Sequence, residues 1–245
     1  MSFGAASPSL KAAPRAGPLL TVTGLGLDYG PVRALDEVSF EVVQGSTTTF
    51  VGTKGAGKSS LVHALAGLAK PSRGSIRFRG RELVGLSSHR IAAFGIALVP
   101  EGRHLFSAMS VRENLELGAS PAHARPGWRQ RLERVLALFP RLADYADIDA
   151  GALNLGEQQM VAIGRCLMAA PELILFDEPT RGLSAKLTRQ LFQLIGTLEA
   201  EGITIILMEE NAPAALRLAD SAHVLERGRI VLSGPGLELL EDGRE

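Results

Sequence analysis

The sequence predicts an α/β fold built on a mainly parallel sheet, and three observations carry this prediction. Short apolar runs at 95–101, 171–179 and 202–210 have the length and composition of buried parallel strands, and helical patterns alternate with them. A glycine-rich loop at 52–59 follows an apolar strand and opens a helix. From 111 to 168 the apolar residues recur at helical spacing without a strong strand, which indicates a helical insertion in the α/β core.

The N-terminal part of the chain predicts an antiparallel β subdomain. Strand-like runs at 19–30 and 38–45 are separated by turn residues, and 75–80 has the pattern of a further antiparallel strand. Between them, a strand at 46–52 leads into the glycine-rich loop and then into a helix at 58–68. The order is therefore strand, loop, helix.

Three further segments complete the sequence-based description. The strand before the loop carries threonines at 47–49, and we expect it to be central, where buried hydroxyls need partners. The run at 223–234 has the pattern of a closing hairpin. Residues 1–17 combine small residues, prolines and scattered charge without an apolar core, so we expect a flexible tail and no signal peptide.

Composition and charge exclude several classes of function. The chain has 245 residues, 46% of them hydrophobic, which suffices for a sizeable core. Lys plus Arg and Asp plus Glu each total 26, so no global basic field favours nucleic acid. The single cysteine, Cys166, can form neither an internal disulfide nor a cysteine metal cage. No apolar run approaches the roughly 20 residues that span a bilayer, so any membrane association must be peripheral.

The loop "GTKGAGKS" satisfies the pattern G-x-x-x-x-G-K-[ST] in the strand–loop–helix context that this pattern requires. Its glycines let successive backbone N–H groups point inward at phosphate, and the helix N-terminus adds partial positive charge. We expect Lys58 to reach the β- and γ-phosphates and Ser59 to ligate Mg²⁺. The alternative is a glycine-rich turn with a surface lysine. The predicted nucleotide-binding residues of the loop are Gly52, Thr53, Lys54, Gly55, Ala56, Gly57, Lys58, Ser59 and Ser60.

A second motif, "LILFDEP", places two acids at the end of a buried strand. Asp177 emerges beside the nucleotide and is predicted to serve the metal. Glu178 follows and is predicted to polarise an attacking water, which makes hydrolysis the expected chemistry. The alternative is a pair of capping carboxylates before a proline.

With these two motifs and "GEQQM" between them, the chain resembles the ATP-binding subunits of ABC transporters. The resemblance covers nearly everything from residue 18 to the end. It implies a single ABC ATPase domain over 18–245, in which a helical subdomain at about 103–168 is inserted in a RecA-like core. More specifically, the chain resembles one of the two ATPase subunits of branched-chain amino acid importers. Urea and short-amide importers have closely related subunits. The segments that carry it are "VPEGRHLF", "LFPRL", "GEQQMVAIGR", "LILFDEPTRGLS" and "LADSAHVLERGRIVLSG".

The resemblance implies cofactors, partners and a location. ATP and Mg²⁺ are the expected ligands. The expected partners are a second ABC ATPase subunit in a heterodimer or homodimer, two membrane permease subunits and an extracytoplasmic substrate-binding protein, with no nucleic acid. The chain would lie peripherally at the cytoplasmic face of the inner membrane.

Three single residues take roles from the resemblance. Tyr29 matches the aromatic residue that stacks on adenine, or it is a strand-end core residue. Glu101, where most relatives carry glutamine, is predicted near Mg²⁺ and the membrane-subunit contact, or it is a loop glutamate. Glu210 takes the switch position where many relatives place a histidine that contacts the γ-phosphate, or it is a solvated strand-end acid.

The segment that closes over the partner's ATP reads L-S-G-G in the family, whereas here it reads Leu153, Asn154, Leu155, Gly156, followed by Glu157. Asn154 and Glu157 form a capping-box pattern, which preserves the helix start. Leu155 replaces a glycine and brings an apolar side chain to a charged phosphate, so the signature is predicted to be degenerate.

Two hypotheses stay open on these residues: a working ATPase subunit that drives amino acid uptake, and a nucleotide-binding but catalytically weak interaction subunit. A soluble ABC ATPase acting on nucleic acid or the ribosome is disfavoured by the neutral charge and by the absence of coiled-coil arms. A GTPase is disfavoured because no N-K-x-D motif is present, and no kinase catalytic loop supports a kinase.

Overall fold

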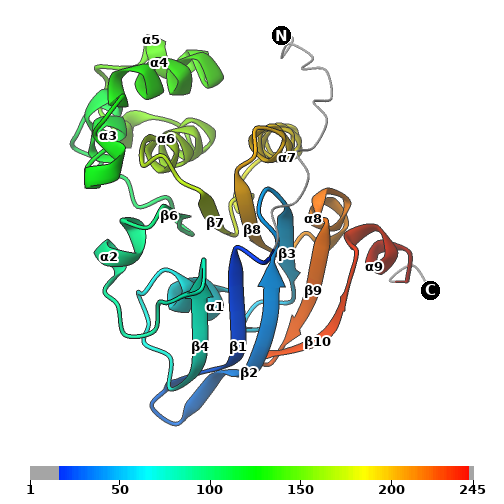
Figure 1. The fold of residues 1–245 in the computed structure, drawn as a ribbon. Coiled ribbons are helices and arrows are strands. Elements are labelled where there is room, and N and C mark those ends of the chain that lie inside the picture. The colour runs from blue at the N-terminus through cyan, green and yellow to red at the C-terminus, as the bar shows by residue number, and fades with distance from the viewer. Residues whose placement is uncertain (1–16, 243–245) are drawn as a thin grey trace.

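The computed structural model describes residues 17–242, so the tail predicted at 1–17 lies, apart from Gly17, outside the described residues. The described chain forms two sheets with helices around them (Figure 1). The strands are β1 (Leu20–Tyr29), β2 (Val32–Val42), β3 (Thr47–Val51), β4 (Arg73–Phe78), β5 (Arg81–Glu82), β6 (Ile96–Val99), β7 (Leu173–Asp177), β8 (Thr204–Glu209), β9 (Ser221–Glu226) and β10 (Arg229–Gly234). The helices are α1 (Lys58–Leu65), α2 (Ser88–Ala92), α3 (Val111–Leu117), α4 (Trp128–Leu138), α5 (Pro140–Asp144), α6 (Leu155–Met168), α7 (Ala185–Ala200), α8 (Ala212–Leu218) and α9 (Gly236–Asp242), with short 3-10 turns at Ala122–Ala124 and Ala150–Ala152.

The larger sheet has six strands in the order β10-β9-β3-β8-β7-β6, and all its pairs are parallel except β9 with β10. The carboxyl ends of its parallel strands therefore meet at one edge, where ligands bind in open α/β sheets. The smaller sheet, β2-β1-β4-β5, is antiparallel. The predicted fold class, with a mainly parallel sheet and an N-terminal antiparallel part, is confirmed.

Side-chain alternation along the buried strands explains how the two sheets are joined. In β7, Leu173 and Leu175 face one apolar core, which also contains β1, β2 and α1. Ile174 and Phe176 face the other, which contains α3 to α8. Because successive side chains of a strand point to opposite faces, the continuous apolar run of β7 covers both. Helix α1 is thus held between the parallel sheet and the antiparallel sheet.

The largest difference between the predicted and the observed strand boundaries is at the start of β2. Strand β2 begins at Val32, before the predicted start at residue 38, because the chain turns tightly after β1 and Tyr29 pairs with Val32. The closing hairpin at 223–234 is confirmed as β9 and β10, and β9 additionally pairs in parallel with β3.

Helices α3 to α6 fill the stretch between β6 and β7, which the structure describes in full and which contains no named strand. In Figure 1 they form the green group at the upper left, apart from the antiparallel sheet. Their apolar residues, such as Leu115, Val135 and Leu142, pack with Val161 of α6 in one core. The helical insertion is therefore present, and its boundaries at about 103 and 168 remain a prediction.

Strand β3 lies in the interior of the sheet between β9 and β8, as expected, and its threonines are buried. The Thr47 hydroxyl donates to Glu199 Oε2 at 3.0 Å. Thr49 Oγ1 finds no hydrogen-bond partner within residues 17–242. The expected demand for hydroxyl partners is therefore met at Thr47 and unmet at Thr49.

Cys166 is buried in α6, and burial raises the pKa of its thiol to about 12. The thiolate form is therefore suppressed at neutral pH, which leaves a structural thiol. No helix within residues 17–242 has both the length and the apolar character needed to cross a membrane.

A buried histidine makes the fold acid-sensitive. His223 on β9 packs against the rings of Phe40 and Phe50, and its Nδ1 lies 2.7 Å from the Ser233 hydroxyl. Burial lowers the pKa of His223 from 6.5 to about 4. Since the folded pKa lies below the unfolded value, protonation at pH below 6.5 favours the unfolded chain. The loss of stability reaches about 3 kcal/mol once the pH has fallen to about 4.

We expect the His223→Gln variant to lose this acid sensitivity, because glutamine can still hydrogen-bond to Ser233 and does not titrate. Between pH 7.5 and pH 5, the free energy of unfolding of the unaltered chain should fall by about 2 kcal/mol more than that of the variant. Urea unfolding at the two pH values measures this difference. Equal declines in both proteins would show that His223 is not the acid-sensitive group.

Candidate nucleotide site

The glycine-rich loop joins the end of β3 at Val51 to the start of α1 at Lys58. The backbone disfavours any other residue at Gly52, Gly55 and Gly57, and Gly55 has a φ of +83°. A Cβ on Gly52 would lie 2.3 Å from the Leu225 carbonyl oxygen, and Gly57 has a φ of +110°, a left-handed conformation that disfavours other residues. Thr53, Lys54 and Gly55 are exposed on the loop, Ala56 is buried beneath it, and Ser60 lies in the first turn of α1.

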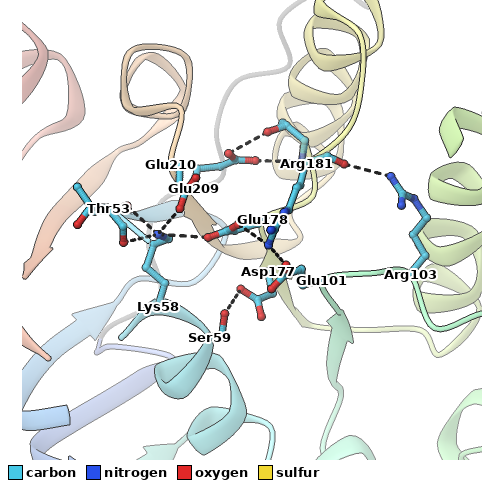
Figure 2. A network of polar contacts seen from close by, with 12 residues as sticks. Thr53, Lys58, Ser59, Glu101, Arg103, Asp177, Glu178, Arg181, Glu209 and Glu210 are labelled. Carbon is cyan, nitrogen blue, oxygen red and sulfur yellow. Dashed lines mark hydrogen bonds and ion pairs between the residues drawn. The ribbon is translucent and has the colours of Figure 1, made fainter. Parts of the chain in front are cut away.

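Lys58 is buried, with only 3% of its side chain exposed, and its ammonium group is surrounded by oxygens. Nζ donates to the carbonyl oxygens of Gly52 at 2.6 Å and Thr53 at 3.1 Å. It also lies 3.2 Å from Glu178 Oε1 and 3.9 Å from Glu210 Oε1 (Figure 2). The lysine predicted to bind phosphate therefore already lies beside the predicted catalytic glutamate.

Ser59 and Asp177, both predicted to serve the metal, are brought together. The Ser59 hydroxyl donates to Asp177 Oδ1 at 3.2 Å (Figure 2). Burial raises the pKa of Asp177, and the Ser59 hydrogen bond partly opposes that rise. A buried carboxylate beside a hydroxyl is a pair of hard oxygen donors, which fits Mg²⁺. Within residues 17–242 no group of three or more His, Cys, Asp or Glu side chains could hold a metal alone, so phosphate and water oxygens would complete the coordination.

Glu178 is 10% exposed and directly follows β7 in a strained backbone conformation, with φ at +44°. Its N–H donates to the Met208 carbonyl at 3.0 Å, which ties the turn to β8. Its Oε2 lies 3.7 Å from Arg181 Nη1. Backbone strain of this kind is held in place by surrounding structure and clusters at functional sites.

The last residue of β8, Glu209, is a site residue that sequence reasoning missed. It is 2% exposed and accepts hydrogen bonds from the Thr180 N–H at 3.1 Å and the Thr180 hydroxyl at 2.9 Å. Burial raises its pKa, and these hydrogen bonds partly offset the rise. Its position at the end of a buried strand, beside the strand that ends in Asp177, was the available signal.

Three residues have roles taken from the resemblance. Glu210 has a side chain 48% exposed and lies 3.9 Å from Lys58 Nζ. Tyr29 ends β1 with 48% of its surface exposed, so its ring is open to a ligand. Glu101 forms an ion pair with Arg181. Adenine stacking by Tyr29, phosphate sensing by Glu210 and metal contact by Glu101 remain predictions.

The signature segment forms the start of α6. Asn154 is the N-cap, and its side-chain oxygen accepts from the N–H groups of Gly156 at 3.0 Å and Glu157 at 3.1 Å. Glu157 Oε2 in turn accepts from the Asn154 N–H at 3.2 Å, so the predicted capping box is confirmed. Leu155 is 52% exposed, and a Cβ on Gly182 would lie 3.9 Å from its Cδ1. Leu155 therefore lies beside the turn that follows Glu178.

These features define a P-loop nucleotide-binding protein. The glycine-rich loop, the Ser59–Asp177 pair and the strained Glu178 all lie at the carboxyl edge of the parallel sheet. The family model described as "ABC transporter" matches residues 35–181, and the chain belongs to that family of ATP-binding subunits.

Relatives and solved structures agree with this assignment. The high-affinity branched-chain amino acid transport ATP-binding protein BraG of Pseudomonas aeruginosa is 47% identical, over 86% of this chain and 91% of that protein. The probable branched-chain amino acid transport ATP-binding protein LivF of Archaeoglobus fulgidus is 33% identical, over 91% of this chain and 94% of that protein. The arabinose import ATP-binding protein AraG of Azospirillum brasilense is 37% identical, and the match covers 88% of this chain but 42% of that protein. A nucleotide-free ATP-binding cassette of an ABC transporter has a TM-score of 0.82 at 26% identity, covering 92% of this chain and 94% of its own.

Proposed function

We propose that this chain is the ATP-binding and ATP-hydrolysing subunit of an ABC importer for branched-chain amino acids. The observation that carries the hydrolytic part is the convergence of Lys58, the Ser59–Asp177 pair and Glu178 at one sheet edge. The substrate class is supported by the similarity to BraG, which extends over 91% of that protein.

The proposed chemistry follows from the contacts that these side chains make in the absence of ATP. The Lys58 ammonium is held by two loop carbonyls and by Glu178, so phosphate oxygens would replace these partners one for one. Ser59 and Asp177 would hold Mg²⁺, whose contribution when bound is to neutralise charge on the phosphate oxygens. Glu178, relieved of Lys58, would accept a hydrogen bond from the attacking water and take its proton.

We further propose that the chain works with a second ABC ATPase subunit, two membrane permease subunits and an extracytoplasmic substrate-binding protein, at the cytoplasmic face of the inner membrane. ATP would lie between the loop 52–59 of one ATPase subunit and the signature of the other. Closure of the pair would then drive the permease.

The test is ATP hydrolysis by the complete importer in proteoliposomes, with its binding protein loaded with leucine or with arabinose. Leucine-loaded binding protein should stimulate Lys58-dependent hydrolysis, and arabinose should not. Stimulation by arabinose alone would indicate that the chain belongs to a sugar importer. Binding of Mg-ATP without turnover would favour the second candidate, described below.

That second candidate is a nucleotide-binding but catalytically weak interaction subunit. Two observations favour it. The half-exposed Leu155 presents an apolar side chain where the family has glycine, and the Glu210 carboxylate lies near Lys58, where a γ-phosphate would also bind. In a heterodimer, Leu155 would weaken the ATP site on the partner's loop, and Glu210 would weaken the ATP site on this chain's own loop.

Restoring glycine at the signature separates the two candidates. If the second candidate is correct, the Leu155→Gly variant should raise the ATPase rate of the assembled complex on the order of tenfold, because the backbone could then approach phosphate and ~1.4 kcal/mol of transition-state stabilisation would be recovered. Leu155→Ala, which keeps a Cβ but removes the apolar end, should lie between. A rate unchanged in both variants would show that Leu155 is not the defect.

A further inference from the structure

Arg181, in the turn after β7, contacts two carboxylates that have separate predicted roles. Its Nη1 lies 3.7 Å from Glu178 Oε2 and forms an ion pair with Glu101 (Figure 2). The Arg181 side chain is 52% exposed, whereas that of Glu178 is 10% exposed. One guanidinium thus joins the predicted base to the loop that follows β6.

The same turn is held from the helical insertion through backbone oxygens. Arg165 of α6 donates from Nη2 to the Arg103 carbonyl at 3.1 Å. Arg103 donates from its own Nη2 to the Arg181 carbonyl at 3.1 Å (Figure 2). Two hydrogen bonds and one ion pair therefore connect α6, the segment 101–103 and the turn that carries Glu178.

Backbone strain occurs at both ends of this connection. Arg103 has a φ of +69° and Glu178 a φ of +44°, conformations that non-glycine residues rarely adopt. Such conformations persist only where neighbouring contacts over-determine them. The contacts of Arg181 and Arg103 are contacts of that kind.

Charge balance shows when Arg181 matters. Glu178 is buried between two cations, Lys58 at 3.2 Å and Arg181 at 3.7 Å. Once the Lys58 ammonium group binds phosphate oxygens, Arg181 is the cation that remains beside Glu178 among the described residues. A buried carboxylate without a charge partner is costly and turns toward any available donor.

We propose that Arg181 is a positioning residue that holds the Glu178 carboxylate in the orientation needed to activate water, and that Glu101 and Arg103 in turn hold Arg181 in place. The proposal rests on the proposed role of Glu178 as the base. It predicts that Arg181 acts on kcat and leaves ATP binding unaltered.

The experiment compares Arg181→Met, of similar length without charge, with Arg181→Lys, which keeps the charge. In the assembled complex, Arg181→Met should lower kcat about tenfold, because a small misorientation of a catalytic group has large effects on rate. Its Kd for ATP should stay within about twofold of the unaltered protein, and Arg181→Lys should recover most of kcat. Arg134→Met, which removes a similarly exposed arginine from its ion pair with Glu201, is the matched control and should leave kcat unchanged.

A double-mutant cycle tests the connection to Glu101. Glu101→Gln should lower kcat about threefold alone and cause no further loss in the Arg181→Met background, since residues acting through one contact are non-additive. Additive losses would mean that Glu101 acts elsewhere, for example on the metal, and would overturn the proposal that Glu101 acts through Arg181.

A second readout needs no turnover. Amide hydrogen exchange of the nucleotide-free chain should be faster at 180–183 in Arg181→Met, where the Arg181 and Leu183 N–H groups close the turn. Unchanged exchange together with unchanged kcat overturns the proposal, as does a Kd raised in proportion to any loss of rate. If Glu178→Gln keeps full turnover, the proposed function of Glu178 is at fault. If Glu178→Gln abolishes turnover and Arg181→Met does not lower it, the role of Arg181 alone is wrong.

Discussion

Replacing Glu178 with glutamine is expected to lower steady-state ATP hydrolysis by about a hundredfold or more, the usual contribution of a positioned general base. ATP binding should persist, because Lys58, Ser59 and Asp177 keep their oxygen and nitrogen donors. Glutamine preserves the shape of the side chain but cannot accept a proton from water. Its loss of charge also frees Lys58, whose Nζ lies 3.2 Å from Glu178 Oε1, so binding of ATP should become slightly tighter.

The measurement is phosphate release by the assembled complex beside titration of Mg-ATP in a calorimeter. Glu172→Gln is the matched control, since Glu172 precedes the other end of β7 and pairs with Arg79. It should hydrolyse ATP at the unaltered rate. Full turnover by Glu178→Gln would refute general-base catalysis by this residue, and a joint loss of binding would indicate structural damage.

Replacing Lys58 with alanine should abolish turnover and weaken Mg-ATP binding by about thirtyfold or more. Truncating one member of a buried charge pair costs about 2 kcal/mol or more, and Lys58 is only 3% exposed. The variant leaves the Gly52 and Thr53 carbonyl oxygens and the Glu178 carboxylate facing the phosphates without a cation. Repulsion then replaces attraction at the γ-phosphate.

Titration with a fluorescent ATP analogue measures this loss. Lys54→Ala is the comparison within the same loop, because Lys54 is exposed, and its effect on affinity should be at least about tenfold smaller. Thermal unfolding of both variants without nucleotide checks that the loop still folds. Equal effects of the two substitutions would mean that bulk positive charge, and not the placement of Lys58, binds the phosphates.

Local motifs made much of this site predictable. The loop 52–59 lies between β3 and α1 because its glycines permit a backbone that β-carbons would block. The capping box at Asn154 follows from residues three positions apart, so it needed no tertiary information. Asp177 and Glu178 end an apolar run whose length and composition identify a buried strand.

Contacts between residues far apart in the chain could not be predicted from local motifs. Glu101 was predicted to lie near the metal or to be a loop glutamate, and its pairing with Arg181, which lies 80 positions away, was not predicted. Glu209 and Thr180 meet because β7 and β8 are neighbours in the sheet. No local motif predicts the partner of Glu101 or of Glu209, because a carboxylate can pair equally well with a metal, an arginine or a hydroxyl.

The sequence by itself determined the fold class, the phosphate loop, the paired acids and the capped start of α6, because each depends on spacing within a few residues or on the period of apolar side chains. Only the tertiary structure decided which charges neutralise one another at the sheet edge. Lys58, Glu178, Arg181 and Glu101 come from three separate segments. Strand order brings those segments together, and at this sheet edge the nearest opposite charge determines the partner of each side chain.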